Sequence, residues 1–247
     1  MREHMKTYED CDALFAFVKN LGCDIVQISG IGPITPEEKE ELVKKYGFDV
    51  CVTHTGFQRM VEDCDAVIAE HKMIDCDCIG IGGMPSENRG SLEGVRAFIA
   101  DANIVAKKMK EQNCVLSYHN HAFEYEELDG SGGKTTMDIL LAETDPEAFF
   151  FTPDVAWMHI AGKNPSEELK RMKNRVKVVH FKDYIIDDDI NIFCELGNGV
   201  VDLDDIYKTC LELNIPYIVY EQDSGFTDSK ASTEISFKNL NEIAARN

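Results

Sequence analysis

The sequence predicts an α/β fold, a TIM-type (β/α) barrel formed as a single domain by residues 1–247. Three observations support this prediction. Short apolar runs rich in β-branched and aromatic residues alternate with helical patterns, the runs are almost continuously apolar, and nearly every run ends in a polar side chain. Such runs are typical of parallel strands covered on both faces, and a barrel carries its catalytic residues at the carboxyl ends of its strands.

Seven segments are predicted as strands, and each is bounded by polar or glycine-bearing turns. They cover residues 23–29, 50–54, 76–82, 114–119, 149–154, 176–181 and 217–221. Between the first two, a helix is predicted in which Thr35 is the cap, Pro36 is the first residue and Gly47 ends the helix.

An open doubly wound sheet is the alternative architecture for seven parallel strands. Such a sheet usually carries a glycine-rich phosphate loop after its first strand. The segments SGIGPITP and GIGGMPSENRG match neither the dinucleotide fingerprint nor the P-loop. The barrel is therefore favoured.

Composition excludes several classes of partner. The chain has 25 basic and 45 acidic residues, and its net charge of -20 would repel a nucleic acid. Its apolar runs are too short to span a bilayer and its start has no apolar signal region, so a cytoplasmic protein without a membrane partner is expected. The nine cysteines are odd in number and include no CxxC pair, which indicates buried free thiols.

Polar side chains capable of chemistry follow or end almost every predicted strand. An isolated Asp after a strand is commonly a helix cap, and an isolated strand-end His is commonly a satisfied buried side chain. The recurrence of such residues on one barrel face favours a shared site. The strand-end residues are Gln27, His54, His119 with His121, Asp154, His180 and Glu221.

Three of these ends suit a divalent cation. Asp154, His180 and Glu221 offer two carboxylates and an imidazole from three strands. With one further carboxylate the set suits Mn²⁺, with Mg²⁺, Co²⁺ or Zn²⁺ as alternatives. Glu124 is a source of that carboxylate, because it lies just past the strand that ends near His119.

Strand alternation indicates which of these neighbours share a face. His119 and His121 point to the same side of their strand, and Lys182 shares the face of His180. If His180 points into the barrel, Lys182 leans toward the same site.

Five motifs in order, YHNHAFEY, PDVAWMHIAGKNP, RVKVVHFKDY, ELGNGVVD and YIVYEQD, resemble the sugar phosphate isomerase/epimerase family of xylose-isomerase-like TIM barrels over essentially the whole chain. Relatives include inosose dehydratase, ketose 3-epimerases and lyases that cleave 3-keto-glycosides. The resemblance implies a metal held by a Glu, Asp, His, Glu/Gln quartet, and Asp154, His180 and Glu221 match it. Glu124 is predicted as the remaining ligand, with His119 as the alternative because many relatives carry a glutamate at that position.

A site of this kind suits proton abstraction next to a carbonyl through an enediolate, hence a metal-dependent sugar isomerase or epimerase. His121 is predicted as the base and Glu221 as the second choice, while Lys182 stabilises an oxyanion or donates a proton. An ion pair of Lys182 with Asp183 or another acid is the structural alternative. The residues predicted to contact a sugar or keto-sugar are Gln27, His54, His119 and Trp157.

Other functions stay open. The enediolate could expel a leaving group, as in a 3-keto-glycoside lyase or an inosose-type dehydratase. A barrel without turnover would be a carbohydrate-binding or assembly subunit. The endonucleases of this superfold use more metal ligands and a basic surface, which the charge argues against.

Relatives begin with a strand ahead of an REHM-like segment, whereas this chain begins at MREHM, so the usual first strand is expected to be missing. We therefore predict a seven-stranded barrel with an open seam between residues 23–29 and 217–221. Unpaired strand edges invite another chain, which favours a homo-oligomer associated near the seam.

Overall fold

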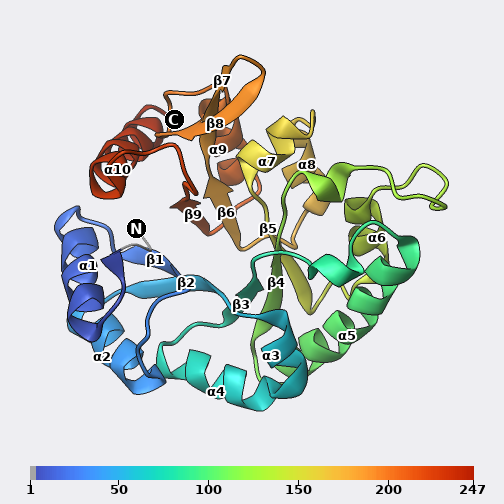
Figure 1. Cartoon of the computed structure of the whole chain (residues 1–247), viewed down its shortest axis with the longest axis horizontal. Helices are drawn as coiled ribbons and strands as arrows, with labels where there is room; N and C mark the ends of the chain where they lie inside the picture. The colour runs from blue at the N-terminus through green and yellow to red at the C-terminus, as the bar shows by residue number, and fades with distance from the viewer. Residues whose placement is uncertain (1–3) are drawn as a thin grey trace.

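Seven parallel strands line the centre of the molecule in the computed structural model, which describes residues 4–247 (Figure 1). β1 to β5 form one continuous sheet, β6 pairs with β9, and bridges from Phe151 to Val176 and from Asp154 to His180 join the two parts. All seven predicted strands are present, and the barrel prediction is confirmed. The strands are β1 (Ile25–Ser29), β2 (Asp49–His54), β3 (Cys78–Ile81), β4 (Val115–His119), β5 (Phe149–Thr152), β6 (Val178–Phe181) and β9 (Tyr217–Tyr220).

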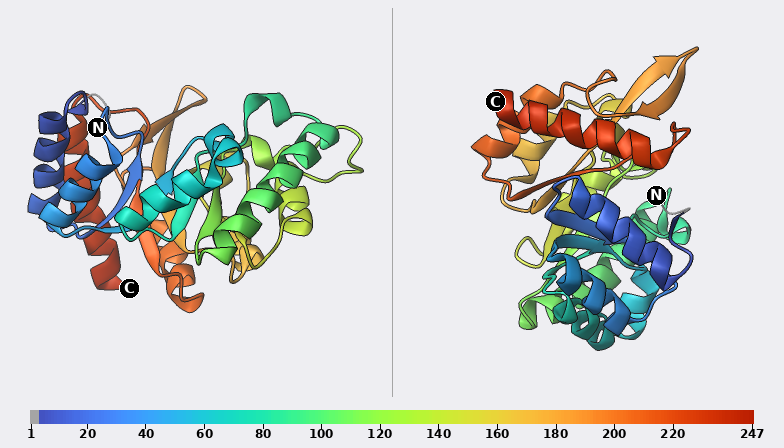
Figure 2. Two further views of the ribbon diagram at one scale, coloured as in Figure 1. Left: turned by 90° about the horizontal axis from the view of Figure 1, so that it is seen from below. Right: turned by 90° about the vertical axis from the view of Figure 1, so that its left-hand side faces the viewer.

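Helices lie outside the strands and cover them (Figures 1 and 2). None of the helices between residues 4 and 247 combines the length and apolar character that crossing a membrane requires. They are α1 (Tyr8–Asn20), α2 (Pro36–Tyr46), α3 (Phe57–Glu62), α4 (Cys64–Met73), α5 (Leu92–Glu111), α6 (Thr136–Glu143), α7 (Val155–Ile160), α8 (Pro165–Met172), α9 (Leu203–Glu212) and α10 (Ser229–Arg246), with the 3₁₀ turns η2 (Ser86–Asn88) and η3 (Phe123–Tyr125).

Local sequence explains both the ends and the buried faces of these elements. The α2 helix begins with the predicted Thr35 cap, which forms a capping box with Glu38, and it ends at Gly47, whose φ of 63° is left-handed. All four residues of β3 and of β6 are buried, as expected for strands packed on both faces. The interiors of these strands therefore belong to the core, and in β6 the buried residues include His180.

An antiparallel hairpin, β7 (Asp183–Asp187) and β8 (Ile190–Cys194), was not predicted. It follows β6 and extends away from the barrel (Figure 2). Its two turn residues, Asp188 and Asp189, have φ values of 46° and 63°, the left-handed pair that a tight hairpin turn requires. Asp-Asp marks such a turn less strongly than Asn-Gly, so the sequence pattern was missed.

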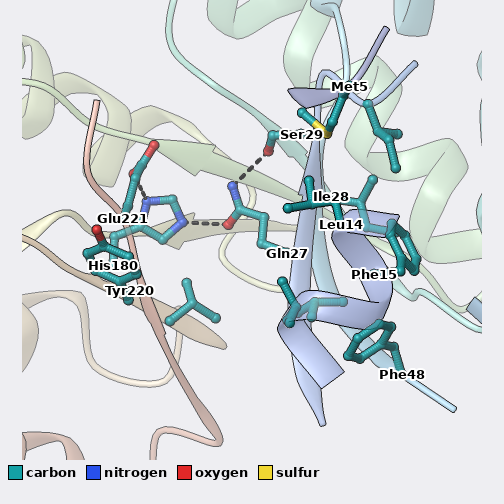
Figure 3. A pocket seen from close by; sticks show the side chains of 14 residues that line it. Met5, Leu14, Phe15, Gln27, Ile28, Ser29, Phe48, His180, Tyr220 and Glu221 are labelled. Carbon is teal, nitrogen blue, oxygen red and sulfur yellow. Dashed lines mark hydrogen bonds and ion pairs between the residues drawn. The ribbon is translucent and has the colours of Figure 1, made fainter. Parts of the chain in front are cut away.

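The barrel has an open seam between β1 and β9, as predicted. Within residues 4–247, β1 forms a ladder only with β2, and β9 only with β6. A cavity of about 220 Å³ lies in the seam between apolar side chains such as Phe15 and Ile28 and the polar pair His180 and Glu221 (Figure 3). A second cavity of about 420 Å³ follows the seam toward the beginning of β1.

The open seam leads to a prediction for hydrogen exchange. Amides of β1 and β9 that face the seam should exchange at least about tenfold faster than amides of β4, because they have no ladder partner. Exchange followed residue by residue by NMR measures this difference. If the amides of β1 and β9 that face the seam were as well protected from exchange as the amides of β4, an open seam in solution would be contradicted. The homo-oligomer stays a prediction, which sedimentation over a range of protein concentrations tests.

Candidate metal centre

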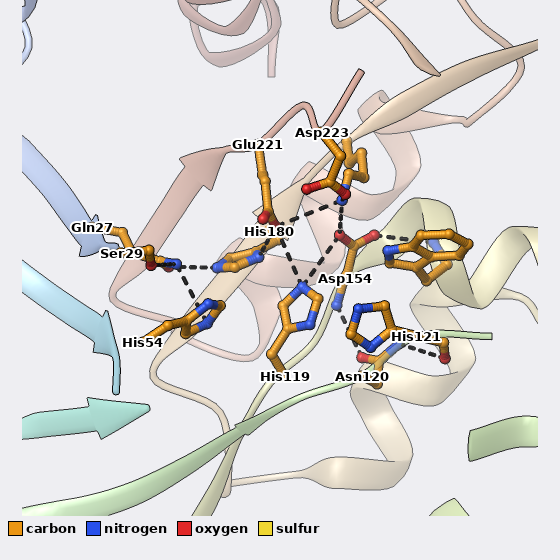
Figure 4. Close-up of polar contacts among 12 residues, drawn as sticks. Gln27, Ser29, His54, His119, Asn120, His121, Asp154, His180, Glu221 and Asp223 are labelled. Carbon is orange, nitrogen blue, oxygen red and sulfur yellow. Dashed lines mark hydrogen bonds and ion pairs between the residues drawn. The ribbon is translucent and has the colours of Figure 1, made fainter. Parts of the chain in front are cut away.

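Four side chains from different strand ends converge at the carboxyl end of the barrel (Figure 4). One potential ligand atom from each of His119, Asp154, His180 and Glu221 lies within 4.8 Å of the others. His119 Nε2 is 3.3 Å from Glu221 Oε2 and 3.5 Å from Asp154 Oδ2, and His180 Nδ1 is 2.5 Å from Glu221 Oε2. The barrel brings them together because each one lies at or within two residues of the carboxyl end of its strand.

The buried atoms of this cluster are short of hydrogen-bond partners. Both ring nitrogens of His119, Nδ1 of His180 and Oε2 of Glu221 are buried without one, since their close contacts lack hydrogen-bond geometry. Leaving such groups unsatisfied is costly, and native proteins rarely do so. A divalent cation would satisfy one nitrogen of each histidine together with Glu221, so the residues present fit a metal ion.

Electrostatics keep both carboxylates ionised. Burial would raise the pKa of Asp154, but Lys182 and His119 outweigh it and hold that pKa below its usual value. Burial acts likewise on Glu221, and His180 and His119 lower its pKa well below the usual value. Burial would lower the pKa of His119, but Asp154 and Glu221 raise it to about 9. Ionised carboxylates are the form that a cation binds.

Asp154 serves the fold and the site with different oxygens. Its Oδ1 accepts a hydrogen bond from the Trp157 N–H and caps α7, whereas Oδ2 faces His119 and Lys182. Its own N–H donates to Asn120 Oδ1 at 3.0 Å. Asp154 can therefore cap α7 and offer an oxygen to a metal at the same time.

Gln27 sets the orientation of His180. The 2.6 Å contact between Gln27 Oε1 and His180 Nε2 requires the imidazole proton on Nε2, which leaves the Nδ1 lone pair facing the cluster. Gln27 Nε2 donates to Ser29 at 2.9 Å and lies 3.4 Å from His54 Nε2. The His54 ring is 5.2 Å from that of His119. Gln27 and His54, predicted to contact substrate, thus lie beside the cluster.

Glu124 does not join the cluster, contrary to the prediction that it supplies a ligand. It is fully buried, Oε1 accepts a hydrogen bond from the Tyr118 hydroxyl at 2.6 Å, and Oε2 accepts one from the His121 N–H at 2.7 Å. Burial raises the pKa of this carboxyl. The 3₁₀ turn η3 directs Glu124 inward instead of over the barrel mouth, and His119, the predicted alternative, lies in the cluster instead.

Lys182 is buried among three carboxylates. Its Nζ lies 2.6 Å from Asp223, 3.1 Å from Asp154 and 3.7 Å from Glu221. Burial would lower its pKa, but these acids outweigh burial and raise it, so the amine stays charged and is a weak proton donor. Asp183, the suggested ion-pair partner, instead accepts four backbone N–H groups of the following chain.

Sequence reasoning missed Asp223 and Asn120. Asp223 lies two residues beyond Glu221, so the alternation that placed Lys182 could have found it. Asn120 points away from the face of its histidine neighbours and acts through the Asp154 backbone, which no sequence pattern indicates.

His121 and Trp157 form a wall next to the cluster. The His121 ring is 4.9 Å from the His119 ring and 5.4 Å from the indole of Trp157. Burial, together with the charge of His119, lowers the pKa of His121 to about 4, so its ring is neutral near pH 7. His121 Nδ1 and Trp157 Nε1 are buried without a hydrogen-bond partner within residues 4–247. The His121 imidazole is therefore a weak base that is free to accept a proton, and the Trp157 indole is free to donate a hydrogen bond.

Comparisons with known proteins agree with this architecture. Residues 15–241 match the model of the family described as xylose isomerase-like TIM barrel. Among curated proteins the chain is similar to an inosose dehydratase of Clostridium tetani, with 34% identity over 83 residues, which are 33% of this chain and 26% of that protein. The matched region thus spans about a quarter of that relative's length.

Solved structures show the same fold. A sugar phosphate isomerase/epimerase from Parabacteroides distasonis superposes with a TM-score of 0.79 at 19% identity, over 96% of this chain and 92% of that one. An L-ribulose 3-epimerase superposes with a TM-score of 0.74 at 14% identity, over 98% and 94% of the two chains. At these identities the likeness concerns the fold alone. On the family match over residues 15–241, the chain belongs to the xylose isomerase-like TIM barrel family.

Proposed function

We propose that this protein is a divalent-metal-dependent sugar isomerase or epimerase that removes a proton next to a carbonyl. One observation carries the proposal: the neutral imidazole of His121 lies next to a buried cluster of two imidazoles and two carboxylates, with its ring centre 4.9 Å from that of His119. A cation site beside a proton acceptor is the arrangement that such a reaction requires.

The proposed ligands are His119, Asp154, His180 and Glu221. A bound ion supplies the positive charge that stabilises negative charge developing on substrate oxygens. Two imidazoles among four ligands suit Mn²⁺, Co²⁺ or Zn²⁺ better than Mg²⁺, and Mn²⁺ is our first candidate.

The other residues have distinct proposed roles. In an isomerisation His121 takes the carbon-bound proton and returns it to the neighbouring carbon, and Glu221 is the alternative base. An epimerisation would need a proton from the opposite face of the same carbon, supplied by a second acid or by solvent. Trp157 offers a flat surface to a sugar ring and an indole N–H to one of its oxygens. Lys182 contributes its charge near the Oδ2 of Asp154, where it stabilises an oxyanion.

Elimination is the second candidate reaction. The similarity to an inosose dehydratase favours it, because the same proton abstraction leads to loss of a hydroxyl group when the next carbon carries one. A 3-keto-glycoside lyase would expel a glycoside oxygen in the same way.

The deciding experiment uses Mn²⁺-loaded protein, a panel of ketoses, inososes and 3-keto-glycosides, and D₂O as solvent. Deuterium on carbon of a recovered sugar or its epimer, seen by NMR, would support the isomerase or epimerase. Release of water or of an aglycone without an epimer would identify elimination. Absence of both, with metal bound, would overturn the proposed activity in favour of a carbohydrate-binding subunit.

Gln27→Ala should weaken Mn²⁺ binding roughly 10- to 100-fold, the usual effect of removing a hydrogen-bond partner of a metal-bound histidine. Without the Gln27 carbonyl, His180 no longer has its tautomer and ring orientation fixed. Calorimetric titration measures the affinity, and Gln58→Ala on the exposed surface of α3 is the matched control. Equal affinity of the two variants would contradict an orienting role.

A further inference from the structure

Arg89 is an exposed cation at the barrel mouth that no carboxylate of residues 4–247 neutralises. It follows η2 in the loop after β3, its Nε donates to the Met84 carbonyl at 2.7 Å, and its guanidinium lies 4.3 Å from the centre of the Phe123 ring. Among the residues from 4 to 247, none forms an ion pair with it. The exposed Arg59, Arg96, Arg171 and Arg246 each pair with a carboxylate.

The lack of a carboxylate partner distinguishes Arg89 from the other exposed arginines among residues 4–247. Acidic residues outnumber basic ones by 45 to 25, so an exposed arginine readily finds an acid. Lys182, a buried cation near the site, is already surrounded by three carboxylates. Arg89, by contrast, has no ion-pair partner within residues 4–247 and can offer its charge to a ligand.

Arg89 and His121 both lie close to Gly83. A Cβ atom added to Gly83 would stand 3.1 Å from His121 Cε1 and 3.9 Å from Arg89 Nη2, so these two atoms are no more than about 7 Å apart. Gly83 has a φ of 144°, which favours glycine and keeps this point free of a side chain. The Phe123 ring also stacks on His121, at 5.8 Å and 17°.

A buried hydrogen-bond network fixes the position of Arg89 relative to His121. The Met84 N–H donates to the Tyr118 hydroxyl at 3.1 Å, and that hydroxyl donates to Glu124. Glu124 in turn accepts the N–H of His121. Because Met84 also holds Arg89 Nε, the loop after β3 is tied to the end of β4. A guanidinium placed in advance loses little freedom when it binds a ligand.

We propose that Arg89 recognises an anionic group, a carboxylate or a phosphate, on the sugar whose proton His121 removes. This inference rests on the proposed function and narrows its substrate to anionic sugars. The two terminal guanidinium nitrogens make no hydrogen bond within the described chain, and such a fork matches two oxygens of a carboxylate or phosphate. The acidic remainder of the surface repels anions, so an anionic substrate depends on this contact.

Binding can be measured without turnover, because Trp157 is the single tryptophan and lies 5.4 Å from His121. Its fluorescence reports titration of Mn²⁺-loaded protein with matched sets of ketoses, their phosphate esters and the corresponding keto-acids. We expect at least one anionic member to bind more tightly than its neutral parent. Arg89→Gln should remove this preference, a loss of roughly 10- to 100-fold for a charged hydrogen-bonded pair. Phosphate esters and keto-acids form separate arms and identify the anion.

Arg89→Lys should keep part of the preference, since it retains the charge without the fork. Arg96→Gln, which removes an arginine paired with Glu143 on the surface, is the matched control and should leave the preference unchanged. An Arg89→Gln protein that keeps the full preference, or a wild type that prefers no anionic sugar, would overturn the proposal. Deuterium exchange tests the proposed reaction separately. A failure of anion recognition by Arg89 can therefore be distinguished from a failure of the proposed reaction.

Discussion

Asp154→Asn and His180→Ala should each abolish stoichiometric binding of Mn²⁺, with affinity falling by more than about 100-fold. Each change removes one of four converging ligand atoms, which costs more than the roughly 10- to 100-fold lost with a ligand's hydrogen-bond partner. Metal analysis after dialysis and calorimetric titration measure the loss. Asparagine retains a capping oxygen for α7, so Asp154→Asn should remain folded.

Glu124 and His119 provide the discriminating controls. Glu124→Gln should keep the metal, because both Glu124 oxygens are occupied by Tyr118 and His121. His119→Ala should lose it, and His119→Glu should retain it by offering a carboxylate in place of the imidazole. If Glu124→Gln released the metal while His119→Ala kept it, Glu124 would return as the ligand.

His121→Gln should lower the rate of deuterium exchange into substrate by roughly 10² to 10⁴, the range for a general base, and leave Mn²⁺ binding intact. Glutamine preserves a polar side chain of similar reach but does not accept a proton near neutral pH. His121 lies next to the four-residue cluster without belonging to it, so the metal should remain. Exchange rates at saturating substrate, with metal content measured in parallel, test this expectation.

His159→Gln is the matched control, since His159 lies in α7 and contacts the hydroxyl of Tyr184. It should exchange deuterium at the wild-type rate. Loss of metal in His121→Gln would make His121 a ligand, and an unchanged exchange rate would move the role of base to Glu221.

The fold could be predicted closely because its determinants are local. Apolar runs, their spacing and the Thr35 to Gly47 helix signals act within a few residues of one another, and the structure has each of these elements. The β7–β8 hairpin escaped prediction because its turn depends on two aspartates in left-handed conformation, which many sequences tolerate without forming a hairpin.

The candidate site was likewise predictable only where local rules determine it. By itself, the sequence determined that His119, Asp154, His180 and Glu221 stand at strand ends, because alternation and barrel topology act along each strand. Beyond a strand end alternation no longer applies, and the turn η3 decided that Glu124 faces Tyr118.

Only the tertiary structure decided which distant groups meet. Arg89 and His121 are 32 positions apart on different loops, and Lys182 meets Asp223 from a different strand end. Such contacts depend on the relative positions of whole elements, which packing determines and which no local pattern encodes. The charge environment follows from the same packing: burial and His119 give His121 a pKa of about 4, and the network through Met84, Tyr118 and Glu124 holds Arg89 beside it.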